Sequence, residues 1–138
     1  MNDGPALAPD AAIVLGIAST ALPFACTPED AAERWLRVLR LHGEAGAALQ
    51  ALGVSEGSLR APDEHEHGLV ASSSPDDRDA VAQVLEHAVR HADRRGATGV
   101  ATSDVLMAVM DVYGADFERV LRAHGTDRDE VIQRLAAA

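Results

Sequence analysis

The sequence predicts an all-α fold made from two copies of one helical unit. Hydrophobic residues make up 47% of the 138-residue chain but aromatic residues only 3%, so the core must consist mostly of Ala, Leu, Val and Ile side chains, which suit closely packed helices. Apolar residues recur at helical spacing in both halves. The stretches LQALGVSEGSLR (49–60) and LRAHGTDRDEVI (121–132) share a Leu-x-Ala-x-Gly pattern, and they lie in opposite halves of the chain. A chain of this length forms a single domain, residues 1–138.

The first repeat, residues 9–60, begins with two helices. Asp10 is a good N-cap for a first helix that Pro23 must end, because proline cannot continue a helix. Thr27 followed by Pro28 predicts the start of a second helix, with the threonine as N-cap and the proline in the first helical position.

A short third helix and a terminal turn complete this repeat. Gly43 interrupts the second helix, and a third is expected over residues 44–52, closed by Gly53 in a left-handed conformation. Residues 55–60 form a last short turn. Residues 61–74 are charged and then serine-rich, a composition typical of a connector.

The second repeat, residues 75–136, follows the same order of elements. A long helix starts after the SPDD sequence and ends at Gly96, and Thr102 is expected to cap the helix that follows. A short helix closes at Gly125, and Asp127 caps a final one. The halves align with one offset for the first two helices and a slightly larger one for the third: Val14, Leu15, Ala18 and Leu36 fall on Val84, Leu85, Ala88 and Leu106, and Leu49, Ala51 and Gly53 fall on Leu121, Ala123 and Gly125.

The charge and the cysteine content limit the possible partners and the cellular location. The formal net charge is −10 and all 12 basic residues are arginine. An acidic surface repels phosphate backbones, so we expect a basic or cationic partner and no nucleic acid. Cys26 is the only cysteine and cannot form an internal disulfide, which indicates a reducing, cytoplasmic location. The first residues lack the positive segment of a secretory signal, and the apolar stretch 11–22 is too short to span a membrane.

The second half carries a pattern that resembles one known repeat. Thr102-Ser103-Asp104 begins a helix, an apolar run follows over residues 105–110, and residues 122–127 form a closing Arg-Ala-His-Gly-Thr-Asp step. This order is similar to one repeat of the Clp amino-terminal domain, which precedes the ATPase modules of Clp unfoldases and disaggregases. The first half resembles the same repeat more weakly, because the loop over residues 23–32 departs from the pattern. Together the two halves cover residues 9–135.

The resemblance implies both a fold and a function. The fold is two pseudo-symmetric four-helix Clp repeats packed into one eight-helix domain. The function is non-catalytic binding of a Clp adaptor or of a substrate polypeptide, without a cofactor. No G-x-x-x-x-G-K-[ST] loop is present, and a chain without lysine cannot supply the lysine of such an ATP-binding loop. An alternative that the resemblance implies is a decoy that sequesters a cyclic peptide antibiotic aimed at Clp proteins.

Candidate binding residues follow from the same resemblance. Family members that read phosphorylated arginine offer a glutamate near the start of the second helix of each repeat, where a carboxylate can grip a guanidinium through two hydrogen bonds. The resemblance places this position at Glu33 in the first repeat, with Glu29 as the rival, and at Ser103, beside Asp104, in the second. Tyr113 lies next to a loop glycine, and we expect it to be partly exposed and available to a bound peptide.

Two histidines have a spacing that is found at metal sites. His87 and His91 are four residues apart on one helix, a spacing that can chelate a metal ion, and Asp93, His65 and His67 are further possible ligands. The apolar face of that helix places His91 at its boundary and His87 on its wet side. We therefore expect surface histidines and no metal site.

Overall fold

The computed structural model describes residues 6–22, 25, 27–54 and 76–137. Within them the chain is all-α, as the sequence predicts, and none of the helices has the length and apolar character needed to cross a membrane. The predicted turn at 55–60 and the connector at 61–74 lie outside the described residues. The seven helices of the described part are α1 (Pro9–Ala21), α2 (Pro28–Arg40), α3 (Gly43–Ala51), α4 (Asp76–Arg94), α5 (Thr102–Tyr113), α6 (Ala115–Ala123) and α7 (Arg128–Ala137).

Two short strands join the start of α1 to the loop after α4. β1 (Ala6–Leu7) pairs in parallel with β2 (Gly99–Val100), with Leu7 opposite Val100. The N–H of Ala8 donates to the carbonyl of Val100 at 2.9 Å and continues this pairing into α1. The sequence did not predict these strands, since such short segments carry no periodic signal.

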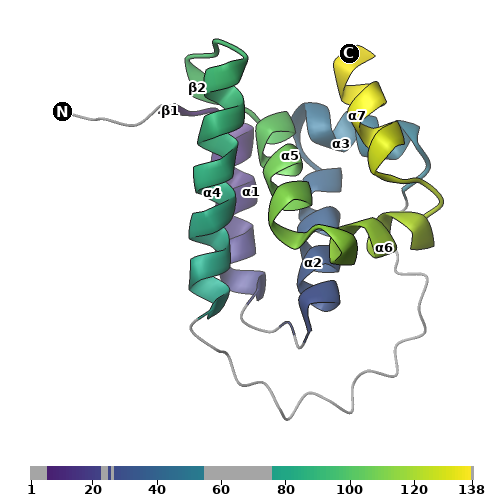
Figure 1. The fold of residues 1–138 in the computed structure, drawn as a ribbon. Helices are drawn as coiled ribbons and strands as arrows, with labels where there is room; N and C mark the ends of the chain where they lie inside the picture. Colours follow the sequence, from purple (N-terminus) through teal and green to yellow (C-terminus); the bar gives the residue numbers. More distant parts are fainter. Residues whose placement is uncertain (1–5, 23–24, 26, 55–75, 138) are drawn as a thin grey trace.

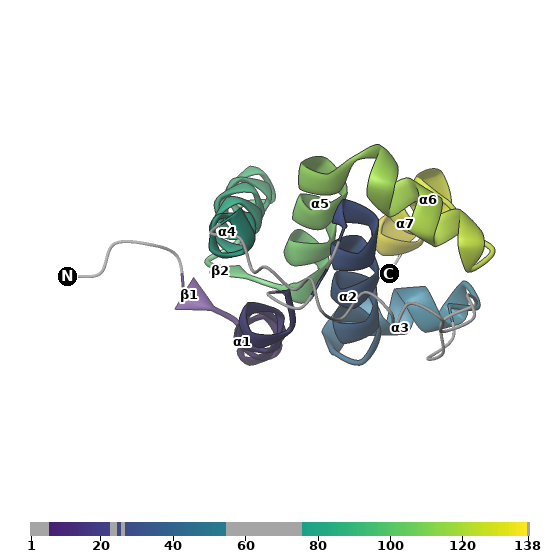
Figure 2. The ribbon, with the colours of Figure 1, turned by 90° about the horizontal axis from the view of Figure 1, so that it is seen from below.

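The helices are arranged around a central antiparallel pair, α2 and α5 (Figures 1 and 2). On one side, α1 and α4 pack against each other and against this pair; on the other side lie α3, α6 and α7. The start of α2 therefore lies near the end of α5, and the start of α5 lies near the end of α2 (Figure 1). This arrangement decides which of the candidate binding residues are neighbours.

The core between the helices consists mostly of small and aliphatic side chains, as the composition predicts. Trp35 and Phe117 are fully buried, and the remaining buried apolar side chains are alanine, leucine, valine and one methionine. The indole N–H of Trp35 donates to the Tyr113 hydroxyl at 3.1 Å and so joins α2 to α5 within the core. A tryptophan is buried at little cost only when its N–H finds an acceptor.

Two of the predicted helix caps are confirmed. The Thr27 hydroxyl accepts the N–H of Asp30 at 3.0 Å at the start of α2. The Asp127 carboxylate accepts the N–H of Glu130 at 2.9 Å at the start of α7. Each side chain replaces the missing partner of a first-turn N–H group.

Two other predicted caps are wrong. Helix α1 begins at Pro9 with Ala8 in the cap position, so Asp10 lies inside its first turn. Its negative charge there interacts favourably with the helix dipole. Helix α5 begins at Thr102 with Ala101 in the cap position. The Thr102 hydroxyl accepts a hydrogen bond from the N–H of Ala45 in α3, at 3.1 Å. This side chain therefore links α5 to α3 and does not cap α5.

The two Leu-x-Ala-x-Gly stretches end their helices in the same way. Gly53 after α3 and Gly125 after α6 have φ of +94° and +90°. In both, the glycine N–H donates to the carbonyl three residues before it, and the next residue donates to the carbonyl five residues before itself, all at 3.0 Å. This is a Schellman C-cap, for which glycine is the favoured residue because the position requires positive φ.

Gly43 combines a left-handed backbone with a close contact to another helix. Its φ is +62°, and a Cβ built on it would lie 2.5 Å from the Thr102 hydroxyl oxygen. We expect Gly43→Ala to lower the free energy of unfolding, measured by urea denaturation, by about 3 kcal/mol, from the left-handed backbone together with the clash. Gly53→Ala is the matched control, because its Cβ would meet nothing within 4 Å; only the backbone cost of about 1 kcal/mol should remain. Equal losses in the two variants would contradict the close α3–α5 contact.

Candidate functional site

The candidate binding residues fall into two groups at opposite ends of the α2–α5 pair. Glu29 and Glu33 lie in the first two turns of α2, while Ser103 and Asp104 lie in the first turn of α5. Because the two helices are antiparallel, these two starts are at opposite ends of the molecule (Figure 1). Tyr113, the last residue of α5, lies at the α2-start end. The structure therefore brings together the residues within each group but not the two groups.

Asp104 is held by contacts inside the chain. Its side chain is only 3% exposed; it accepts the N–H of Ala101 at 2.9 Å and the Nε–H of Arg95 at 2.9 Å. A second Arg95 nitrogen, Nη2, donates to Asp104 Oδ2. This hydrogen-bonded carboxylate raises the pKa of Arg95, against the opposing effect of desolvation, and Glu44 adds a smaller attraction. Asp104 therefore fixes the start of α5 to the end of α4, and both of its oxygens are already used.

Ser103 has a different setting from its neighbour. Its side chain is half-buried in the first turn of α5, between two residues that both make buried contacts, Thr102 and Asp104. Glu29 is likewise half-buried in the first turn of α2. Each of these side chains therefore keeps part of its surface in solvent at the beginning of a central helix.

Glu33 makes a contact that links distant parts of the chain. One of its carboxylate oxygens lies 3.2 Å from Nε2 of His124, at the end of α6, and 3.8 Å from Nε of Arg37. An ionised carboxylate can only accept, so the Nε2–H of His124 donates. The His124 side chain is 3% exposed, and its Nδ1 is buried without a hydrogen-bond partner in the described part of the chain. No local pattern in the sequence indicates this pair, because its members lie in different halves of the chain.

Tyr113 is half-buried, and its hydroxyl is the acceptor for the Trp35 indole. The sequence predicted partial exposure for Tyr113, and this prediction is confirmed. Tyr113 therefore takes part in the α2–α5 contact and keeps part of its side chain exposed to solvent.

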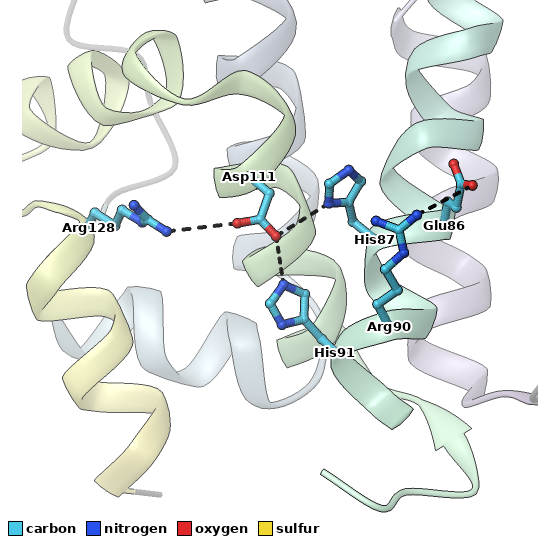
Figure 3. Close-up of polar contacts among 6 residues, drawn as sticks. All are labelled: Glu86, His87, Arg90, His91, Asp111 and Arg128. Atoms are coloured by element: carbon cyan, nitrogen blue, oxygen red, sulfur yellow. Dashed lines mark hydrogen bonds and ion pairs between the residues drawn. The ribbon is translucent and has the colours of Figure 1, made fainter. Parts of the chain in front are cut away.

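A polar cluster on another face joins three helices around Asp111 (Figure 3). One Asp111 oxygen, Oδ2, lies 2.7 Å from Nε2 of His91 and 3.5 Å from Nδ1 of His87, both on α4. The other, Oδ1, lies 3.8 Å from Nη2 of Arg128 on α7. Sequence reasoning found the histidine pair but not Asp111, because Asp111 belongs to the next helix and no spacing rule connects it to the pair.

The exposure of His87 and His91 agrees with the positions predicted for them on α4. His91 is 16% exposed and His87 36% exposed, which agrees with a boundary and a wet position. Among the residues that the structure describes, no group of three or more histidine, cysteine or carboxylate side chains is arranged to hold a metal ion. His65 and His67 lie outside those residues.

Comparison with known proteins leaves the chain without an assigned family. No protein-family model matches the sequence, and no curated protein matches it. The resemblance to the Clp amino-terminal domain therefore rests on the order of the helices and on the residues quoted above.

The buried carboxylate of Asp104 should contribute measurably to stability. We expect Asp104→Asn to lower the free energy of unfolding by about 2 kcal/mol, because Arg95 loses its charged acceptor and the amide matches the Ala101 N–H and the guanidinium less well. Urea denaturation followed by circular dichroism measures the loss. Glu86→Gln is the control: Glu86 forms an i,i+4 pair with Arg90 in which both side chains are more than half exposed, and it should change stability by no more than about 0.5 kcal/mol. If Asp104→Asn also lowered the free energy of unfolding by no more than about 0.5 kcal/mol, the structural role of Asp104 would be contradicted.

The Asp111 cluster should also stabilise the packing of α4, α5 and α7. We expect Asp111→Ala to cost about 1 kcal/mol in urea denaturation, because it removes a hydrogen bond between helices and the charge near Arg128. Asp116→Ala is the comparison, since Asp116 pairs with Arg119 only within one turn of α6, and such exposed pairs contribute at most about 0.5 kcal/mol. If Asp116→Ala cost more than Asp111→Ala, the contacts of Asp111 would not hold the three helices together.

Proposed function

We propose that the chain is a non-catalytic protein-interaction module similar to the Clp amino-terminal domain, and that it binds an adaptor or a substrate polypeptide. The observation that carries this proposal is the repetition of one helical order. Helices α1, α2 and α3 recur as α4, α5 and α6, and α3 and α6 both have 9 residues and both end in a Schellman cap. The glycines of the two caps, Gly53 and Gly125, fall on each other when the halves are aligned.

The contacts between helices also support two related halves. Helix α2 packs against α6, and α3 packs against α5. When each helix is exchanged for its counterpart in the other half, the first contact becomes the second. The contacts of α1 with α4 and of α2 with α5 are unchanged by the exchange. Such a pattern is expected when two copies of a unit pack about a pseudo-two-fold axis and bury their apolar faces against each other.

The starts of α2 and α5 are the best places for a bound polypeptide in this proposal. Glu29 and Ser103 are half-buried there, so a ligand can reach them while their backbones stay fixed. Asp104 is unsuited, because its two oxygens already bind Arg95 and Ala101. Glu33 shares its carboxylate with His124. We therefore place the main attraction for a basic ligand at Glu29.

A peptide titration tests this assignment. The probe is a fluorescein-labelled, unstructured peptide of about 20 residues, rich in arginine and leucine, and its anisotropy reports binding. We expect Glu29→Gln to weaken binding about fivefold, roughly 1 kcal/mol, because it removes a charged acceptor for a guanidinium. Replacing every arginine of the peptide by lysine should weaken binding to the unmodified protein similarly, because lysine lacks the planar fork of donors.

The matched control separates a site from general charge. Glu86→Gln removes the same charge from α4, where Glu86 forms an exposed ion pair with Arg90. It should leave the dissociation constant of the peptide unchanged. An equal loss in both variants would show attraction to the acidic protein as a whole. Absence of binding at millimolar peptide would contradict the peptide-binding assignment.

A second experiment tests the class of partner. The purified chain is immobilised through an attachment point away from α2 and exposed to a native extract of its source cell. Bound proteins are identified by mass spectrometry. Recovery of Clp ATPase subunits, an adaptor or unfolded clients, reduced by Glu29→Gln, supports the proposal. Recovery of none of these classes would count against it.

A further inference from the structure

Two large apolar side chains are exposed on the outward side of α1. Ile13 is 47% exposed and Ile17 41% exposed, and Gly16 lies between them on the same face. Helix α1 carries no charged residue after Asp10, which stands in its first turn. Leu7, in β1 just before the helix, is 37% exposed. Single exposed apolar residues are common on proteins, but a one-sided group on a helix without charges is less so.

Helix α4, the counterpart of α1 in the second half of the chain, has a different composition on the corresponding face. With the two halves aligned as above, the buried positions agree, since Val14 and Ala18 correspond to Val84 and Ala88, and all four are buried. The residues at the outward positions differ in character: Ile13 and Gly16 correspond to Gln83 and Glu86, which are exposed, and Ile17 corresponds to His87, which is half-buried beside Asp111. The outward face of α4 thus carries polar or charged residues where α1 has Ile13, Gly16 and Ile17.

The contacts of the described residues do not explain why Gly16 is a glycine. A glycine in the middle of a helix weakens it, and a Cβ built on Gly16 would meet nothing within 4 Å. The missing side chain therefore relieves no contact within the described part of the protein. It does allow a second backbone to approach the helix closely between Ile13 and Ile17.

We propose that α1 is the contact between two copies of this chain. The two α1 helices cross at Gly16 about a two-fold axis, and Ile13 and Ile17 of each copy pack on the same residues of the other. Such a contact is isologous, so one patch must complement itself, and a glycine flanked by two isoleucines does so. Each copy carries a net charge of −10, and this uncharged face lets two copies meet without placing like charges together. Asp10 lies about 9 Å from the crossing along the helix axis.

The size of the patch sets the expected affinity. A helix of 13 residues is about 20 Å long, and one crossed pair of such helices buries less than the roughly 800 Å² per partner that is typical of stable complexes. We therefore expect reversible association, with a dissociation constant in the range of about 10 μM to 1 mM.

Sedimentation equilibrium of the whole chain, from concentrations of about 5 μM to about 1 mM, tests the contact. The unmodified protein should shift from monomer to dimer with concentration, and Ile13→Gln/Ile17→Gln should weaken the association at least tenfold. Leu41→Gln is the matched control: Leu41 is 59% exposed but lies at the end of α2, so removal of its apolar surface should leave the dissociation constant unchanged. Circular dichroism spectra and melting curves check that all variants remain folded.

Gly16→Leu distinguishes a close helix crossing from general hydrophobic association. The new side chain points into open space in the monomer, so the fold should be kept and the helix strengthened. It adds apolar surface, which would strengthen unspecific association, but it prevents close approach of the second helix. We expect at least tenfold weaker dimerisation.

Three results would overturn the proposal. These are a protein that stays monomeric at millimolar concentration, a dimer that Ile13→Gln/Ile17→Gln leaves unchanged, and a dimer that Gly16→Leu strengthens. In the first case the apolar face is covered by a different protein or by a segment of the same chain. The measurement uses no peptide ligand, so its failure leaves the proposed binding at Glu29 unaffected.

Discussion

The antiparallel contact between α2 and α5 is the interaction on which the other contacts depend. Trp35 brings the largest side chain of the core to this contact, and its indole N–H is satisfied by Tyr113 from the opposite helix. Helices α1 and α4 cover one side of the pair, and α3, α6 and α7 cover the other. Because most of the buried side chains are small, the helices can approach closely, and the position of one central helix determines the positions of its neighbours.

The polar contacts follow from this packing and hold the ends of the central helices. At one end the Thr102 hydroxyl accepts from Ala45, and Asp104 binds Arg95. At the other end Glu33 meets His124. Candidate ligand-binding carboxylates and structural carboxylates thus occupy neighbouring positions along the same helices. A carboxylate whose oxygens are all hydrogen-bonded within the fold is a poor ligand group. The sequence offered both Asp104 and Glu29 as candidate binding residues, and the contacts of Asp104 argue against it.

Much of the fold could be predicted from the sequence because its signals are local. Helical spacing of apolar residues, the Thr27 and Asp127 caps and the glycines after α3 and α6 each act within a few residues. Asp10 and Thr102 were misassigned as caps because α1 begins at Pro9 and α5 at Thr102, so Ala8 and Ala101 occupy the cap positions. The pairs Glu33–His124 and His91–Asp111 were missed, since they join residues from different helices and no spacing rule connects them.

The single tryptophan of the chain gives the buried α2–α5 contact an optical consequence. Trp35 is fully enclosed and hydrogen-bonded to a residue 78 positions away, from the other half of the sequence. Its emission therefore originates from the boundary between the halves rather than from within either one. Opening of that boundary would expose the indole to water and shift its emission to longer wavelength even if every helix stayed intact. Fluorescence and circular dichroism would then report different events, and their coincidence during unfolding would mean that neither half persists without the other.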